Sequence, residues 1–180
     1  MNNSSIIIEN PLQLFEHLLS EARTGAENIT PVLLELSQVT EDPDIKEALE
    51  ARIFVSNNIL DRLDQCFKLI GARPTKLRGR LQDLFIEECR LELAEIRSPT
   101  ARRLYVLAKA NQLIHLRMGE YAGVIECGEM TGHCGVRLLL DTCRTDDVCF
   151  TELTKRLMRN IVEGNGVASA VVHMQGLKPD

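Results

Sequence analysis

The chain has 180 residues, of which 44% are hydrophobic and 26% charged, and its net charge is −5. This length allows one domain with a proper core and is short for two. Basic residues are scattered among acidic ones without forming a Lys/Arg stripe, which argues against nucleic acid as a partner. Aromatic residues are scarce and Trp is absent, a composition that favours helix over strand.

The start of the chain and its cysteines indicate where the protein works. "MNNSSIIIENP" has neither the basic region nor the apolar stretch of a secretory signal. No apolar run approaches the roughly 18 residues that a membrane span needs, so we expect no membrane association. The six cysteines contain no CxxC pair and are expected to be reduced, buried, small hydrophobic residues. The expected location is the cytoplasm.

The first predicted helix covers about residues 11–38 and follows a flexible segment, 1–9. Asn10 can cap this helix and Pro11 suits its first position. Apolar residues then recur in steps of three and four, which predicts one buried seam. Its members are Leu12, Phe15, Leu19, Ala22, Ala26, Ile29, Leu33 and Leu36.

The next two predicted helices cover about 43–70 and 76–96, separated by the break "GARPTK". The second helix carries an apolar stripe that includes Ser56. The shorter third helix carries the stripe Leu77, Leu81, Leu84, Glu88 and Leu91. Glu88 is therefore predicted to lie on a line of leucines.

The last two predicted helices cover about 98–126 and 134–162. The seam of the fourth includes Asn111 and His115, and that of the fifth includes Asp147. Residues 164–180 are predicted to be a flexible tail. No strand pattern with hairpin turns is present. We therefore predict an all-α protein, an antiparallel four-helix bundle with an additional short helix, over residues 10–163.

Polar residues on the inward seams need an explanation, because a buried charge without a metal or a partner costs several kcal/mol, as an order of magnitude. Carboxylates and histidines on facing helices are how bundles hold two iron or manganese ions. The ordinary interpretations remain open: His115 as a core or shoulder histidine, Glu88 paired with Arg or Lys from a neighbouring helix, and Glu27 solvated. Asp147 either lies at the surface or accepts a hydrogen bond from His115.

The sequence resembles the YciE/YciF-type ferritin-like proteins, the DUF892 family. The resemblance is carried, in family order, by "LFEHLLSEARTGAENI" (14–29), "NILDRLDQCFKLIG" (58–71), "LFIEECRLEL" (84–93), "IHLRMGEYAGVIECGEMTGH" (114–133) and "DVCFTELTKRL" (147–157). It implies a ferritin-like bundle that forms a homodimer and is associated with bacterial stress responses. The biochemical activity that it implies is unsettled.

The same resemblance implies that a dinuclear metal centre has been lost. The vestigial ligand positions are Glu27, Glu88 and His115, and the lost positions are Phe54, Asn57 and Ile114. The glutamate-rich stretch of the family's last helix falls on residues 141–144, which contain no Glu. In this alignment Phe54 and Ile114 are expected to fill the former cavity with hydrocarbon.

A second group of candidate ligands lies at the last turn. Cys127, His133 and Cys134 are residue types that zinc accepts, but their spacing fits no common zinc pattern. His133 beside Cys134 is also the one pairing that could suggest a cysteine nucleophile. We expect neither a zinc site nor catalysis here.

Taken together, the residues and the resemblance predict a non-enzymatic structural or interaction protein without catalytic residues, cofactor or metal. Its expected partners are a second copy, contacting near Phe67 and the "GARPTK" break, and an unidentified protein. The alternative is a residual metal-binding protein that stores or oxidises iron, or binds manganese, through Glu27, Glu88 and His115.

Overall fold

The computed structural model describes residues 7–77 and 80–175, with side chains described up to Gly164 apart from those of Arg80 and Gln82. Within these residues it contains five helices and no strand: α1 (Pro11–Gln38), α2 (Pro43–Ile70), α3 (Arg80–Glu95), α4 (Pro99–Met130) and α5 (Cys134–Gln175). None of the described helices is long and apolar enough to cross a membrane. The predicted all-α class is confirmed.

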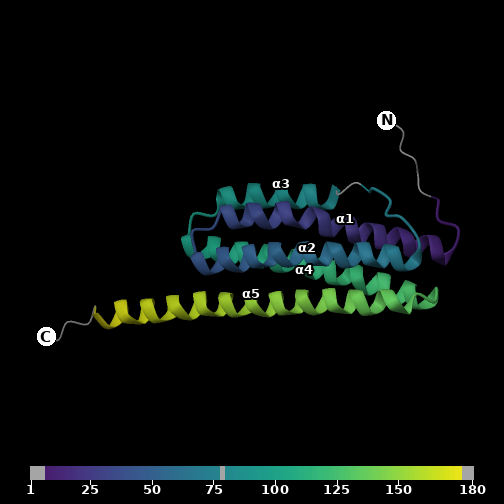
Figure 1. The fold of residues 1–180 in the computed structure, drawn as a ribbon. Coiled ribbons are helices and arrows are strands. Elements are labelled where there is room, and N and C mark those ends of the chain that lie inside the picture. The colour runs from purple at the N-terminus through teal and green to yellow at the C-terminus, as the bar shows by residue number, and fades with distance from the viewer. Residues whose placement is uncertain (1–6, 78–79, 176–180) are drawn as a thin grey trace.

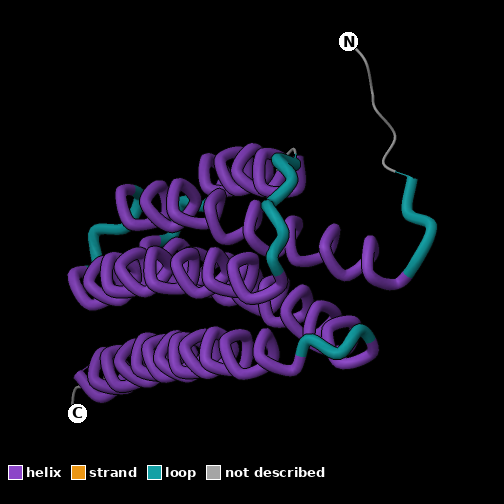
Figure 2. The backbone as a smooth tube through the Cα atoms, turned by 45° about the vertical axis from the view of Figure 1, so that its right-hand side comes forward, coloured by secondary structure: helices purple, strands orange, loops and turns teal. Residues whose placement is uncertain are grey.

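The four long helices form an antiparallel bundle (Figure 1). In it, α1 packs against α2 and α4, and α5 packs against the same two helices. The short helix α3 lies outside this bundle against α1 and α4, beside the half of α1 that ends at Gln38 (Figures 1 and 2). The predicted architecture, four antiparallel helices and an additional short one, is therefore confirmed.

Short polar caps and glycines set the helix ends. The side chain of Asn10 accepts a hydrogen bond from the backbone N–H of Gln13, at 3.0 Å, and Pro11 follows it. Asp42 and Ser98 cap α2 and α4 in the same way. Gly71 ends α2 with φ 69°, a left-handed conformation that glycine adopts without steric cost.

The core consists of two apolar clusters at opposite ends of the bundle. The first gathers Phe15, Leu19, Ala22, Ala26, Ile59, Leu63, Cys66, Phe67, Tyr121, Val124, Ile125, Val136, Leu140 and Cys143. The second gathers Ile29, Val32, Leu33, Leu36, Ile45, Leu49, Leu93, Val106, Leu107, Ala110, Leu113, Ile114, Phe150 and Ile161. On α2, α4 and α5 the residues between the two clusters are polar and buried.

The predicted seam of α1 is confirmed except at Leu12, and Asp147 on α5 faces inward as predicted, but the seams of α3 and α4 are wrong. Helix α3 buries Cys89 and Leu93, and the predicted line through Leu84 and Leu91 faces water. Helix α4 buries a seam that includes Arg117. Both helices are thus rotated about their axes relative to the prediction.

Two boundaries also differ from the prediction. Helix α4 continues to Met130, and α5 continues to Gln175. Residues 164–175, predicted to be a flexible tail, are therefore helical in backbone, and their flexibility stays a prediction. The rest of that tail, 176–180, and most of the predicted flexible start, 1–6, lie outside the described residues.

Candidate functional site

A buried polar layer crosses the bundle between its two apolar clusters. It consists of Arg52 and Ser56 on α2, Arg117 on α4 and Asp147 on α5, which are between 0% and 3% exposed. Each stands on its helix at a position facing the axis, one to two turns from apolar residues on either side. We refer to these four residues as the polar layer.

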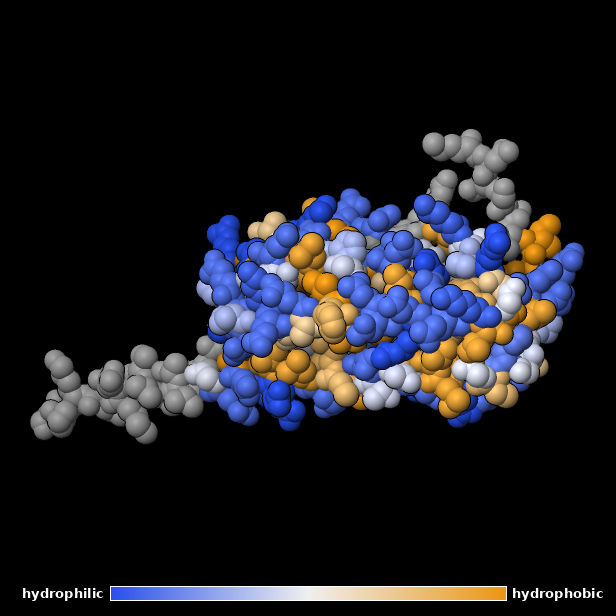
Figure 3. All heavy atoms as spheres, in the orientation of Figure 1, coloured by the Kyte–Doolittle hydropathy of each residue, from blue (hydrophilic) through white to orange (hydrophobic). Residues whose placement is uncertain are grey.

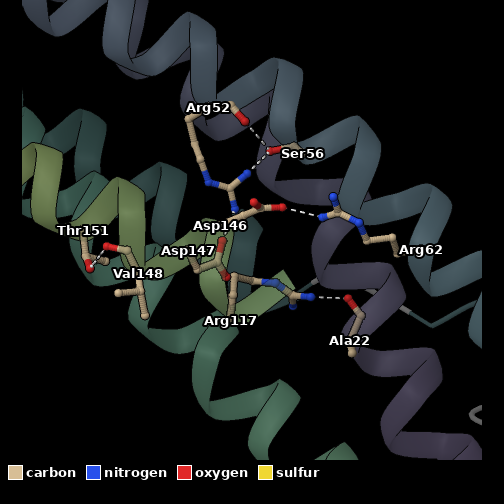
Figure 4. Close-up of polar contacts among 9 residues, drawn as sticks. All are labelled: Ala22, Arg52, Ser56, Arg62, Arg117, Asp146, Asp147, Val148 and Thr151. Atoms are coloured by element: carbon tan, nitrogen blue, oxygen red, sulfur yellow. Dashed lines mark hydrogen bonds and ion pairs between the residues drawn. The ribbon is translucent and has the colours of Figure 1, made fainter. Parts of the chain in front are cut away.

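One half of the polar layer joins α2 to α5. Arg52 Nη2 donates to Asp147 Oδ1 at 2.5 Å, and Arg52 Nη1 donates to Ser56 Oγ at 2.7 Å (Figure 4). The hydroxyl of Ser56 donates in turn to the backbone carbonyl of Arg52, at 3.0 Å. The Arg52 guanidinium also lies 5.9 Å from the ring centroid of Phe150. This half therefore carries one buried ion pair.

The other half joins α4 to α1. Arg117 donates from Nη2 to the backbone carbonyl of Ala22, and from Nη1 to the partly exposed carboxylate of Glu120. Its guanidinium lies 5.2 Å from the ring centroid of Tyr121. A Cβ at position 25 would lie 2.7 Å from Arg117 Cζ, so glycine at this position leaves room for the guanidinium. Together with the first half, Arg117 makes the layer reach all four bundle helices.

The polar layer places three charged side chains, Arg52, Arg117 and Asp147, in the interior, where an unpaired charge is costly. Arginine stays protonated in proteins, so two positive charges are fixed in the interior. Arg52 Nε, Arg117 Nε and Asp147 Oδ2 are buried without a hydrogen-bond partner. Because removing either member of a buried pair leaves an uncompensated charge, the layer is stable only as a set.

Burial also raises the pKa values of acidic groups in and beside the polar layer. It raises the pKa of Asp147 to about 6, although the guanidinium groups of Arg52 and Arg117 act to lower it. Burial likewise raises the pKa of Tyr121 to about 12 and that of the Cys143 thiol to about 11. Cys143 is therefore a poor nucleophile, because the thiol rather than the thiolate dominates near neutral pH.

The structure does not bring the three vestigial ligand positions together. Glu27 is exposed and pairs with Arg23 at 3.3 Å on its own helix. Glu88 is exposed on α3, where its carboxylate lies 3.9 Å from Lys109. His115 is exposed on α4. The solvated interpretation of Glu27 and the paired one of Glu88 are confirmed, and the core interpretation of His115 is wrong.

The lost ligand positions also need correction. Ile114 is fully buried, as predicted. Phe54 is 69% exposed and Asn57 is exposed, so neither fills a cavity inside the bundle. The register carried over by resemblance was therefore wrong for α2, where the inward residues at this level are Arg52 and Ser56.

Sequence reasoning placed Asp147 on an inward stripe, and that stripe is confirmed. The surface interpretation is wrong, and its partner is Arg52 rather than His115. Arg52 and Arg117 were missed as interior residues. The signal for Arg117 was its spacing of four residues from both Leu113 and Tyr121, a register that the predicted seam through Asn111 and His115 does not contain.

The cysteines do not assemble a site with His133. His133 stacks on Phe15 with ring centroids 5.1 Å apart, and Cys134 is exposed. Cys66, Cys89 and Cys143 are buried, as predicted, whereas Cys149 is exposed. Among the described residues, no group of three or more His, Cys, Asp or Glu side chains is placed to hold a metal ion.

Comparison with known proteins identifies a family that this chain matches. The family described as "Domain of unknown function (DUF892)" matches residues 10–165. Protein YciF of Escherichia coli K12 is 20% identical over 150 residues, which cover 82% of this chain and 90% of YciF. The crystal structure of the E. coli stress protein YciF superposes with a TM-score of 0.80 at 20% identity, covering 87% of this chain and 99% of that one.

A second solved structure is equally similar in fold. YcfI of Rhodopseudomonas palustris, described as a candidate structural protein, gives a TM-score of 0.79 at 22% identity, covering 84% of this chain and 96% of that one. A Xanthomonas campestris protein gives a TM-score of 0.63 at 11% identity over 93% and 99% of the two chains. At these identities the likeness extends to the fold alone.

Proposed function

The chain belongs to the DUF892 family, and from this premise we propose that it is a non-enzymatic, stress-associated structural or interaction protein of the YciF type. In this proposal the polar layer takes the place that a dinuclear metal centre occupies in ferritin-like bundles. The stress association draws support from the E. coli relative, which is described as a stress protein. The structural role draws support from the description of the R. palustris protein.

The observation that carries the proposal is the pair of guanidinium groups inside the bundle. A dinuclear centre of the ferritin-like kind gathers several carboxylates with imidazoles at the middle of the four helices. At this level the described residues offer one buried carboxylate, Asp147, and the two buried cations Arg52 and Arg117, while Glu120 on Arg117 is partly exposed. A divalent ion here would meet like charge in a poorly solvated interior, where repulsion is weakly screened. The guanidinium groups themselves link the helices that metal ions would otherwise link.

Metal analysis tests this proposal. Protein purified without a histidine tag and without chelators should carry far less than one iron, manganese or zinc ion per chain, and should not accelerate ferrous oxidation. Two ions per chain, lost on Glu27→Gln and His115→Ala, would overturn the proposal in favour of iron storage or oxidation. In the host, the His115→Ala variant should restore any stress phenotype of a deletion strain as fully as the unaltered chain.

We further propose that the protein forms a homodimer in the cytoplasm, as the family resemblance implies. Phe67 is 3% exposed and Cys66 is fully buried, so neither supplies apolar surface for the contact predicted at this end of α2, which stays a prediction. Sedimentation equilibrium should give twice the chain mass of 20.2 kDa. A single species of chain mass at micromolar concentration would contradict dimerisation.

A further inference from the structure

Two apolar pockets open along α4, one on either side of a stretch that α3 leaves uncovered. The α3 pocket, about 260 Å³, is lined by Leu81, Phe85, Gln112, Leu113 and Leu116. The α1 pocket, about 330 Å³, is lined by Ile8, Glu9, Asn10, Pro11, Leu14, Cys127 and Met130. Residues 71–77, which lead from α2 to the start of α3, lie against α1, where the Thr75 N–H donates to Ser20 Oγ, and none of them lines either pocket (Figure 1).

The two pockets lie on one face of α4. Leu116 and Cys127 are 11 residues apart, close to three helical turns, which separates them by about 17 Å along the axis. Met130 at the far end is 79% exposed and Leu116 is 38% exposed. Hydrophobic surface also shows at the right-hand end of Figure 3, and Ile7, which precedes α1 in the chain, is 76% exposed. This apolar surface is exposed in the single chain.

Between the pockets, α4 carries glycines that the chain itself does not need. Gly119 and Gly123 are exposed, and a Cβ on either would meet nothing within 4 Å. Glycine inside a helix is less stable than alanine. By contrast, Gly25 and Gly128 stand against Arg117 and Phe15. A flat helix surface of this kind permits close approach of another helix.

The charge around this surface is acidic. Glu9 lines the α1 pocket, and Glu126 is exposed one turn from Gly123. Glu120 lies between the pockets with its side chain 25% exposed. The buried Arg117 already donates to the Glu120 carboxylate, so the charge left for a partner is that of Glu9 and Glu126. A partner that fits therefore combines apolar anchors with basic residues.

We propose that this face of α4 docks a basic amphipathic helix of another protein, lying in line with α3. Two apolar side chains of that helix, 11 residues apart, fill the α3 and α1 pockets, and its backbone crosses α4 at Gly119 and Gly123. Lysine or arginine beside the anchors faces Glu9 and Glu126. This surface is separate from the polar layer, so the inference does not depend on the absence of a metal.

A model peptide tests the surface directly. We would use a fluorescein-labelled helix of 18 residues with leucine at positions 3, 7, 10 and 14 and lysine or alanine elsewhere, and follow its anisotropy. The matched control peptide carries glutamate in place of lysine. The test variant is Gly119→Gln with Gly123→Gln, which fills the flat stretch. Gly164→Gln is the control variant, because that helical glycine is also open and lies on α5.

The lysine peptide should bind, and should bind more weakly as salt is raised. The double variant should weaken binding at least tenfold, whereas Gly164→Gln should leave it unchanged and the glutamate peptide should not bind. Equal binding of both peptides, or of both variants, would overturn the proposal. So would a double variant that converts a dimer to a monomer, because a second copy would then be the natural occupant. Melting temperatures of the variants establish that each is folded.

Discussion

At the scale of single residues, the Arg52–Asp147 pair makes a prediction about charge removal. Asp147→Leu leaves the Arg52 guanidinium buried without its anion, and should lower the free energy of unfolding at pH 7.5 by about 3–5 kcal/mol. Arg52→Met combined with Asp147→Leu removes both charges and should recover most of that loss. Urea denaturation of the unaltered chain, the two single variants Asp147→Leu and Arg52→Met, and the double variant measures both effects. A double variant as unstable as the sum of its single changes would contradict the coupling.

The raised pKa of Asp147 predicts how its contribution to stability varies with pH. Its pKa is about 6 in the folded chain, against a usual value of 3.8. Between about pH 6 and pH 4 the folded chain therefore takes up this proton before the unfolded chain does. The contribution of Asp147 to the free energy of unfolding should rise as the pH falls through that window, and be smallest above it.

Comparison with Asp147→Asn isolates this contribution from those of the surface carboxylates. The difference in unfolding free energy, unaltered chain minus variant, should increase from pH 7 to pH 4. Urea titrations at four pH values give this difference. A difference that shrinks as the pH falls would show that Arg52 and Arg117 hold the pKa of the carboxyl below its usual range.

Gly25 predicts a steric effect on the same layer. Gly25→Ala places a methyl group against the Arg117 guanidinium, and overpacking of this kind costs about 1–3 kcal/mol. Gly164→Ala, at an open helical position, should instead stabilise the chain by roughly 0.5–1 kcal/mol. Thermal and urea unfolding compare the two. If both changes stabilise the protein, Arg117 has room to move away.

At the scale of helices, α3 is attached through a small set of polar contacts. Lys109 on α4 reaches Glu92 at 2.8 Å, and the hydroxyl of Tyr105 donates to the same carboxylate. Arg90 donates to Glu35 on α1. Beneath these contacts only Cys89 and Leu93 of the described α3 side chains are fully buried. Few buried apolar contacts are typical of segments that open locally.

We therefore expect α3 to exchange its amide hydrogens faster than the four bundle helices. Lys109→Met keeps the apolar stem and removes the charge that holds Glu92, so it should accelerate exchange in α3 further and leave α2 unchanged. Hydrogen exchange with mass spectrometry resolves these segments. Equal protection of α3 and α2 in the unaltered chain would contradict the weak attachment.

The helices also differ in how well their sequences predict their ends and their buried faces. Proline, Asn10 and Asp42 mark where α1 and α2 begin, and a strong apolar period fixes the phase of α1. In α4 the pattern allows two phases, and the correct one buries Arg117. In α3 the line of leucines is the exposed face. Apolar periodicity locates helices, but the tertiary partners decide the phase of a helix with apolar residues on several sides.

The candidate site was less predictable than the fold for a related reason. Sequence rules place arginine outside because an unpaired buried charge is expensive. A partner of opposite charge offsets this penalty. For Arg52 the partner is Asp147, which lies 95 residues away in the chain. A pair so distant in sequence leaves no local signal.

At the scale of the whole molecule, the polar layer shows where a metal centre could be rebuilt. Arg52→Glu with Arg117→Glu would place two new carboxylates beside Asp147 inside the bundle. This chain should be less stable without metal at pH 7.5, because like charges then face one another. Added manganous ion should restore part of the loss, about 2.7 kcal/mol at a hundredfold excess over its dissociation constant.

A matched control uses the positions that resemblance had suggested. Phe54→Glu with Asn57→His alters two exposed positions of α2, so its melting temperature should not respond to manganese. A response of this control equal to that of the layer variant would place the ion at the surface rather than in the bundle.

The position of the polar layer between two hydrocarbon clusters has a consequence for which structure the chain selects. Apolar clusters alone would tolerate the sliding of one helix along another, because a shifted helix can place one apolar side chain where another had been at similar energy. Moving α5 by one turn, about 5.4 Å, would carry Asp147 away from Arg52 and leave each charge facing hydrocarbon. The same slide of α4 would take Arg117 away from the notch at Gly25. The polar layer thus contributes to the specificity of helix alignment more than to net stability, because a misaligned bundle would contain buried, unpaired charges.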